Sequence, residues 1–255
     1  QDIKPIIGCE FYIGEQETKD VFHILCIAKN NKGLKNLYKL NTYSYLKNFY
    51  SKPRISLEKL QEHKEGLIVT TGCMGSEWGN LLPKHEDLAK ENLEAYRAMF
   101  GDDFYVEIQS NNIPEQKIYN AKMVELATIL GIPVVVTSDV HYVRKEDAEA
   151  HDVLLCMQVK KKVQDENRLR FSCDDFYLKS ESEIHSELVS MGLEPSLVES
   201  AIRNTHKIAD KCDALIETGM HLLPKYSEDE NYQLALRCNE GYKKRYGKYN
   251  KEIVE

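Results

Sequence analysis

Two residues that could bind a metal ion follow a strongly apolar run. Residues 132–137 read Ile-Pro-Val-Val-Val-Thr, and Asp139 and His141 come directly after them. A run rich in β-branched residues predicts a buried strand, and the carboxyl ends of such strands form the catalytic face of an α/β barrel. Side chains two positions apart on a strand point the same way, so a carboxylate oxygen and an imidazole nitrogen would converge on a divalent cation. The alternative is a loop aspartate that caps a helix, beside an exposed histidine.

Three more residues of metal-binding type lie in or beside predicted strands. Glu10 closes one apolar run, His23 begins the next, and Cys73 directly follows a third. Each has an ordinary explanation on its own: a solvated glutamate, a structural histidine and a small cysteine beside glycine. Together with Asp139 and His141 they predict a metal site, because four of the five follow the carboxyl ends of strands, where a barrel gathers its active site.

The elements that must position these residues alternate between strands and helices. Strands are predicted over 3–13, 23–28, 66–71, 104–109 and 132–137. Helical spacing of apolar residues predicts helices over 33–47, 87–100 and 114–130, and, after the fifth strand, over 145–159, 180–192 and 195–212. Residues 168–178 look extended, and 226–255 read as an edge segment or the start of another domain. The alternation predicts a parallel sheet or barrel.

Two further polar features have an ordinary structural interpretation. Glu107 and Gln109 alternate inward on the fourth predicted strand, where hydrogen bonds inside the barrel are favoured over contact with the metal. His151 lies in a predicted helix next to apolar residues, and we expect it to pack or hydrogen-bond and not to bind metal.

Composition excludes several protein classes. The chain has 255 residues, of which 42% are hydrophobic, enough for one barrel-sized domain or two small ones. It has no apolar stretch of membrane-spanning length and no signal-peptide pattern, so we expect no membrane partner. The seven cysteines are odd in number and mostly lie in apolar runs, which predicts thiols in a reducing compartment. No Cys-x-x-Cys pair occurs, which argues against a zinc finger.

The charge is unevenly distributed along the chain. Residues 21–57 contain no acid and seven bases, so the remainder carries −14 in a chain whose net charge is −7. Five of these bases are candidate nucleic-acid contacts because tyrosines and a phenylalanine lie among them: Lys35, Lys39, Lys47, Lys52 and Arg54. The favoured alternative is a helix with buried tyrosines and solvated lysines.

Several stretches together resemble a known family. They include Pro-Ile-Ile-Gly-Cys-Glu at 5–10, Val-Val-Thr-Ser-Asp-Val-His at 135–141 and Leu-Leu-Pro-Lys-Tyr at 222–226. Further matching stretches lie at 23–30, 33–37, 70–75, 104–109 and 150–156. The chain resembles the PHP (polymerase and histidinol phosphatase) domain of bacterial DNA polymerase III alpha subunits over nearly its whole length.

The resemblance implies a fold and a ligand set. The family fold is a distorted (β/α)7 barrel that binds up to three divalent metals, of zinc, manganese or iron type. Glu10 would bridge two metals, and His23 and Cys73 would complete the first site with it. Asp139 would belong to the second metal and His141 to the third. A thiolate at position 73 favours zinc over magnesium.

The sequence also departs from the family pattern. The usual opening strands, with a His-x-His pair and an Asp-His, have no match, so the barrel would lack its first two strands and hold at most one or two metals. None of the polymerase's catalytic carboxylates is present either. We expect a PHP domain over 1–212, with a partial barrel over 1–143 and a helical extension over 144–212. Residues 213–255 would form a linker and the start of the polymerase region.

The resemblance further implies a role. The parent would be a magnesium-dependent DNA polymerase in the bacterial cytoplasm, acting on DNA in the replisome with a proofreading exonuclease subunit and other replisome subunits. The PHP region would scaffold it and could carry 3′–5′ exonuclease or phosphoesterase activity, whereas we expect the isolated fragment to be inactive. Two alternatives remain: a stand-alone metal-dependent phosphoesterase of the histidinol phosphatase kind, and a purely structural interaction module.

Overall fold

The chain divides into two units in the computed structural model, which describes residues 3–15, 18–220 and 223–247. The first unit is Gln1–Leu215 and the second is Ile216–Glu255. In the described part of the second unit, Asp229 caps helix α9 (Glu230–Tyr246), which ends at Gly247. Leu222 of the matching stretch at 222–226, and the end of the segment 226–255, lie outside the described residues.

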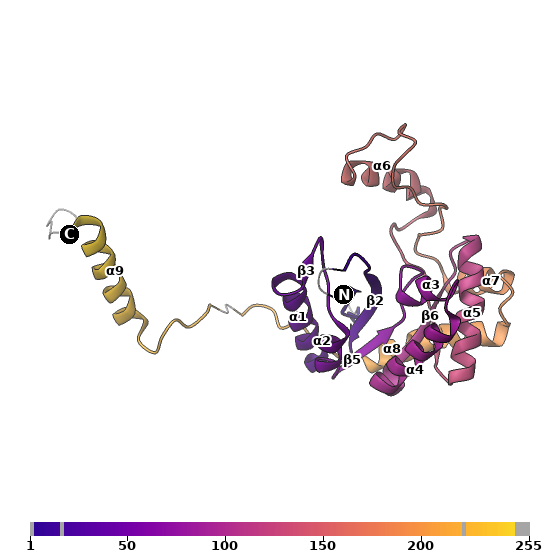
Figure 1. The fold of residues 1–255 in the computed structure, drawn as a ribbon, viewed down its shortest axis with the longest axis horizontal. Coiled ribbons are helices and arrows are strands. Elements are labelled where there is room, and N and C mark those ends of the chain that lie inside the picture. The colour runs from indigo at the N-terminus through magenta and orange to yellow at the C-terminus, as the bar shows by residue number, and fades with distance from the viewer. Residues whose placement is uncertain (1–2, 16–17, 221–222, 248–255) are drawn as a thin grey trace. The chain divides into compact units, whose positions relative to one another are not determined.

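The first unit is built on a five-stranded sheet with the order β1-β2-β5-β6-β7 (Figure 1). The strands are β1 (Gly8–Ile13), β2 (Phe22–Ala28), β5 (Leu67–Thr70), β6 (Phe104–Gln109) and β7 (Val134–Thr137). The five predicted strands are confirmed in place, although β1 is shorter than expected. The fold is mixed α/β.

The directions of the strands correct one prediction. β5, β6 and β7 are parallel, but β1 pairs antiparallel with β2, and β2 pairs antiparallel with β5. The all-parallel sheet was therefore the wrong expectation. Only residues 14–21 join β1 to β2, and a parallel crossover needs a dozen residues or more, so these two strands form a hairpin.

Helices connect and cover the strands. They are α1 (Asn31–Leu46), α2 (Leu57–Glu62), α3 (Glu77–Leu81), α4 (Glu86–Phe100), α5 (Pro114–Leu130), α6 (Ala148–Gln158), α7 (Glu181–Ser190) and α8 (Pro195–Lys211). The six predicted helices are confirmed, with shifts of a few residues at their ends. The short helices α2 and α3 were missed. A small hairpin of β3 (Phe49–Tyr50) and β4 (Lys52–Pro53) follows α1. Residues 168–178, which were predicted to be extended, form no named strand in the structure. They contribute one isolated β-bridge, between Tyr177 and Tyr142.

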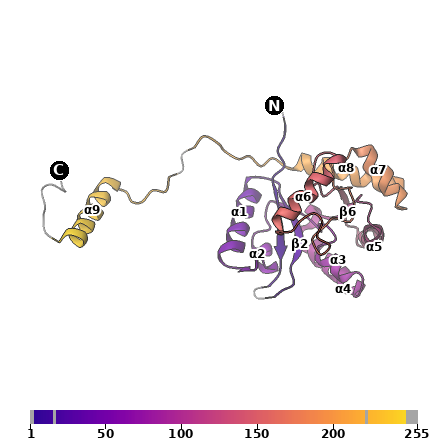
Figure 2. The ribbon, with the colours of Figure 1, turned by 90° about the horizontal axis from the view of Figure 1, so that it is seen from above.

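The core lies on both faces of the sheet, because all six residues of β6 are buried. α1 lies at the β1–β2 end of the first unit, whereas α5 and α7 lie at the other end (Figures 1 and 2). The Asn204 side-chain amide of α8 donates to the Val134 carbonyl at 2.7 Å and so ties this helix to β7. None of the described helices is both long and apolar enough to cross a membrane.

Two ion pairs and one close backbone approach tie the ends of these elements together. Asp103, just before β6, accepts hydrogen bonds from Lys29 after β2 and from Lys211 at the end of α8. The first turn of α1 packs so closely on the turn before β5 that a Cβ at Gly33 would lie 1.9 Å from the Gly66 carbonyl oxygen. Glycine is therefore required at position 33 by contact with the neighbouring backbone.

Candidate metal centre

Three side chains from separate parts of the chain converge on one point. The Nδ1 atom of His23 lies 2.9 Å from Glu10 Oε1 and 3.3 Å from Cys73 Sγ. One donor atom from each residue lies within 4.8 Å of the other two, and within the described residues this is the only such group of three or more potential metal ligands. Glu10 is exposed and the other two are half-buried, so the group opens to solvent.

The antiparallel strands bring these residues together. In the β1–β2 register Tyr12 faces His23 and Glu10 faces Leu25, so Glu10 and His23 are diagonal neighbours. Because β2 runs antiparallel to β5, the amino end of β2, with His23, lies beside the carboxyl end of β5, which leads to Cys73. Glu10 lies inside β1 and not at a strand end, which corrects its expected position.

The loop after β5 holds the thiol against the imidazole. Gly72 has φ +73°, the left-handed backbone that glycine adopts most readily. The backbone N–H of His23 donates to the Gly75 carbonyl at 3.0 Å, and the N–H of Gly75 donates to Cys73 Sγ at 3.3 Å. These bonds orient the ligands from behind, as outer-shell contacts do in metal sites.

The donor set fits a divalent cation. A tetrahedral zinc site has metal–ligand lengths of about 2.0–2.3 Å, which separates its donors by roughly 3.3–3.7 Å. The distances from His23 Nδ1 to Glu10 Oε1 and Cys73 Sγ, 2.9 and 3.3 Å, lie within a few tenths of an ångström of that range. Three protein ligands leave a fourth position open, which is the pattern of a catalytic rather than a closed structural zinc site. The cysteine sulfur favours zinc.

Electrostatics links the three groups. Hydrogen bonds to Cys73 and then to Glu10 raise the pKa of His23 to about 10. The hydrogen bond from His23 in turn lowers the pKa of Glu10. Both contacts are made by Nδ1, so a cation that binds there would replace the proton that this nitrogen carries when it donates to Glu10.

Asp139 and His141 form a neighbouring pair, separate from the group of three. Asp139 Oδ1 lies 3.3 Å from His141 Nε2. β7 ends at Thr137 and Asp139 has φ +46°, so the expected same-side geometry of a strand does not bring them together. Burial raises the pKa of Asp139, and the negative charge of Glu10 raises it further. The Asp139–His141 pair therefore interacts electrostatically with the Glu10–His23–Cys73 group.

A buried polar network lies at the carboxyl ends of the parallel strands. The carboxylate of Glu107 on β6 accepts hydrogen bonds from the hydroxyls of Thr70 on β5 and Thr137 at the end of β7, and from the side-chain amide of Gln109. The predicted interior hydrogen bonding of Glu107 and Gln109 is confirmed. The network joins the three strands that lead to Cys73 and Asp139.

The five candidate nucleic-acid contacts separate into two kinds. Lys35, Lys39, Lys47 and Lys52 are exposed. Arg54 is buried, and its guanidinium donates to the backbone carbonyls of residues 15, 18 and 50. Arg54 was therefore wrong as a surface contact, because its donors already hold a loop in place. The expectation that the tyrosines of this segment are buried is also wrong for Tyr38, Tyr45 and Tyr50, which are exposed.

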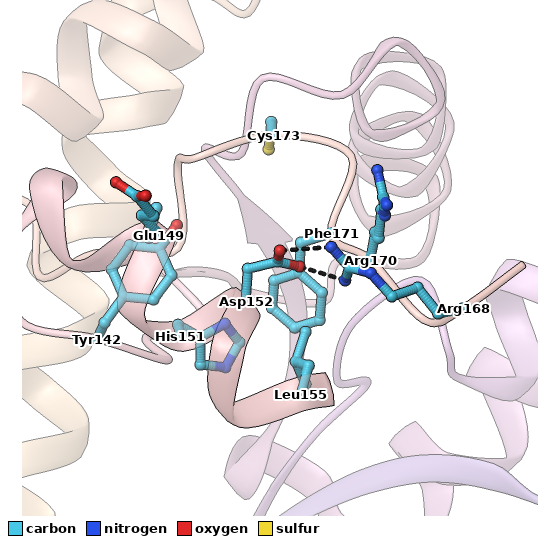
Figure 3. Close-up of a pocket in the computed structure, with 10 residues that line it drawn as sticks. Tyr142, Glu149, His151, Asp152, Leu155, Arg168, Arg170, Phe171 and Cys173 are labelled. Carbon is cyan, nitrogen blue, oxygen red and sulfur yellow. Dashed lines mark hydrogen bonds and ion pairs between the residues drawn. The ribbon is translucent and has the colours of Figure 1, made fainter. Parts of the chain in front are cut away.

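A cavity lies beside His141. It has a volume of about 300 Å³ and is lined by residues of α6 and of the segment 168–173 (Figure 3). The His151 ring packs on those of His141 and Phe171, which confirms its predicted packing role. Arg168 forms two hydrogen bonds of 2.5 Å with Asp152, drawn as dashed lines in Figure 3. The guanidinium of Arg168 is thus already paired with a carboxylate.

Comparison with known proteins shows what this chain is similar to. Residues 1–111 match the PHP domain family. The DNA polymerase III alpha subunit of Deinococcus radiodurans is 40% identical over 233 residues, which cover 86% of this chain and 17% of that protein. That of Thermus aquaticus is 40% identical over 240 residues, covering 88% and 19%. That of Treponema pallidum is 38% identical over 270 residues, covering 99% and 22%.

The chain spans about a fifth of the length of these relatives. The similarity nevertheless covers most of the chain itself, and it includes β1 with Glu10, β2 with His23 and the loop after β5 with Cys73. Residues 1–111 therefore match the PHP domain family, and over most of its length the chain is similar to the PHP region of DNA polymerase III alpha subunits.

Proposed function

We propose that this chain is the PHP region of a bacterial replicative DNA polymerase and that it binds a divalent metal. The observation that carries the proposal is the convergence of Glu10, His23 and Cys73 on one point. Residues 1–212 would form the PHP domain, whose five-stranded sheet would be part of a distorted barrel, and 213–255 would lead towards the polymerase region.

The ligands have separate tasks in this proposal. Glu10, His23 and Cys73 hold a metal of zinc, manganese or iron type, with zinc favoured by the sulfur ligand. Asp139 and His141 would belong to further metals beside it. A bound divalent metal supplies a water of lowered pKa and stabilises the negative charge of a phosphoester. The backbone hydrogen bonds of Gly75 to His23 and Cys73 keep these donor atoms close together.

The parent protein would add nucleotides to DNA in the replisome, in the cytoplasm, with magnesium at its polymerase site. The PHP region would scaffold that enzyme, bind its proofreading exonuclease subunit and other replisome subunits, and act on phosphoesters only in the intact parent. The identity of 38–40% with three polymerase alpha subunits supports this assignment.

The experiment uses the complete protein encoded by the reading frame that contains this chain. We expect it to extend a primer, and Cys73→Ala to lower its metal content and the melting temperature of its PHP region. Loss of a metal present at 100 to 1,000 times its Kd costs about 3–4 kcal/mol, a fall of roughly 6–16 °C for a domain of this size.

Cys238→Ala is the matched control, because Cys238 is an exposed thiol on α9. It should leave metal content and melting temperature unchanged. A protein that does not synthesise DNA would refute the polymerase assignment. A Cys73→Ala variant with the full metal content of the unmodified protein would refute the site.

A further inference from the structure

One face of α1 is unusually rich in exposed aromatic and basic side chains. Six of its exposed positions follow helical spacing of three and four residues and form a single stripe, the α1 outer face: Lys35, Tyr38, Lys39, Thr42, Tyr45 and Leu46. Tyr38 and Tyr45 are 53% and 57% exposed, although tyrosine is usually more buried than that in a helix that packs on a sheet. The stripe extends over about 15 Å from Lys35 to Tyr45, at 1.5 Å per residue.

The β3–β4 hairpin continues this surface. The ring of Phe49 lies 6.3 Å from that of Tyr45, and Phe49 is itself 53% exposed. The hairpin turns at Ser51, which has φ +62°, and brings Lys52 back towards β1. Figure 1 shows β3 next to α1 at this end of the first unit.

Lys52 joins the surface to the metal centre. Its Nζ lies 3.0 Å from the hydroxyl oxygen of Tyr12 and 4.3 Å from the centroid of the same ring. The Tyr12 ring packs edge-on against the His23 ring, with centroids 4.9 Å apart. A basic and aromatic path thus leads from the α1 outer face to a ligand of the candidate metal site.

Charge identifies the kind of ligand that this surface fits. Lys35, Lys39 and Lys47 are exposed and form no direct ion pair within the described residues, although Lys39 lies near enough to Glu62 to help lower the pKa of that carboxyl. The segment 21–57 contains no acid, although the chain as a whole carries −7. Unpaired cations without neighbouring acids in their own segment suit a polyanion, and exposed flat rings suit bases that stack on them.

We propose that the α1 outer face and the β3–β4 hairpin bind single-stranded DNA and guide it towards the Glu10–His23–Cys73 site, with Lys52 and Tyr12 at the junction. The destination of the strand rests on the proposed function, but its binding to this surface does not. A single strand is favoured over duplex because its bases can turn outward onto Tyr38, Tyr45 and Phe49.

The test measures the fluorescence anisotropy of a labelled oligothymidylate of about 12 nucleotides, a length within the range of single-strand sites. The 255-residue chain is titrated at several salt concentrations. We expect the triple variant Lys35→Ser, Lys39→Ser, Lys47→Ser to bind more weakly. The slope of log K against log salt should fall in magnitude by about 2, since each lost phosphate contact on a single strand removes about 0.7.

The charge-matched control replaces three exposed lysines elsewhere with serine: Lys84, Lys117 and Lys207. It should bind the oligonucleotide much more tightly than the α1 triple variant, although both lose three charges. Equal losses in the two triple variants would mean that only net charge matters, and would overturn the proposal.

The stacking part of the proposal has its own variant. Tyr38→Ala with Tyr45→Ala should weaken binding by about tenfold for each ring that stacks on a base. Tyr232→Ala, at an exposed tyrosine of α9, is the control and should have no effect. If the tyrosine variant binds the oligonucleotide normally, or if polyglutamate binds the surface as tightly as the oligonucleotide, the surface accepts an acidic protein segment and the proposal fails.

Metal content separates this proposal from the proposed function. The α1 variants should keep the metal of the unmodified chain, because none of the changed residues contacts a ligand. Cys73→Ala should lose metal but keep its affinity for the oligonucleotide. Unchanged DNA binding by the α1 variants would refute the DNA-binding surface and leave the metal site untouched. A metal-free unmodified chain would refute the metal site and leave the DNA-binding surface untouched.

Discussion

Glu107 is the residue whose replacement most directly tests how the strand ends are held together. Its side chain is 4% exposed and accepts hydrogen bonds from Thr70, from Thr137 at 2.6 Å and from Gln109 at 3.1 Å. Glu107→Leu leaves these three donors, of which Thr70 and Gln109 are buried and Thr137 is half-buried, without their acceptor. At about 1–3 kcal/mol for each unsatisfied group, partly offset by the new apolar surface, we expect a loss of about 3–6 kcal/mol in the free energy of unfolding.

Glu107→Gln is the matched control, because it keeps the size and one acceptor oxygen. The two threonine hydroxyls can rotate to accept from the new amide, so we expect a loss of about 1 kcal/mol or less at pH 7. Both variants are measured by unfolding in guanidinium chloride. The slope of the unfolding free energy against denaturant concentration should match that of the unmodified chain, which shows that the same surface is exposed on unfolding. A leucine variant less than 1 kcal/mol below the unmodified chain, or a glutamine variant as unstable as the leucine one, would refute the network.

The same pair predicts a pH dependence. Burial raises the pKa of Glu107 above its ordinary value despite the hydrogen bonds, so the folded state prefers the protonated carboxyl. The stability that this preference contributes is fully present below the unfolded pKa of about 4.3 and is lost as pH rises through the folded pKa. The glutamine variant has no such group. Its stability relative to the unmodified chain should therefore improve as pH rises from about 4; a constant difference would contradict the raised pKa.

Two further predictions concern contacts between elements. Gly33→Ala should lower the free energy of unfolding, measured by thermal unfolding, by about 2 kcal/mol or more, because the added Cβ would meet the Gly66 carbonyl. Gly241→Ala on α9 is the control: its Cβ meets no atom within 4 Å, so it should be neutral or stabilising. Equal effects of the two substitutions would contradict the close approach at Gly33. Partial burial alone would raise the pKa of Asp103, but the hydrogen bonds from its two lysines lower it overall. The stability that this lowered pKa contributes is present above the pKa of Asp103 in the unfolded chain. It is lost as pH falls through the pKa of Asp103 in the folded chain. Asp103→Asn should therefore lose about 1 kcal/mol at pH 7, after allowance for solvent screening, and little at pH 2, and a loss that is the same at both values would count against the ion pairs.

Much of the fold could be predicted from the sequence because its elements are long and regular. The β-branched run before Asp139 and the helical spacing over 114–130 leave little ambiguity, and α5 ends at Leu130 as predicted, before Gly131 in the left-handed conformation. The direction of β1 and β2 could not be read in the same way. Alternating strands and helices favour parallel pairing, but the short link over 14–21 decides in favour of a hairpin.

The candidate site was predictable as a set of residue types and not as a geometry. Glu10 and His23 meet through the register of an antiparallel pair, which strand-end reasoning does not include. Arg54 carries the same charge as Lys52, and only the structure shows that its donors bind three carbonyls inside the fold. Exposure of Tyr38 and Tyr45 is likewise decided by which face of α1 packs on the sheet.

The central claim is that Glu10, His23 and Cys73 share one metal ion. X-ray absorption at the metal edge, combined with elemental analysis of the purified chain, tests it most directly. We expect at least one divalent metal per chain with a single sulfur neighbour at about 2.3 Å, and the loss of that sulfur signal in Cys73→Ser. A chain that holds no stoichiometric metal after reconstitution with zinc, manganese or iron, or a bound metal without a sulfur neighbour, would contradict the account.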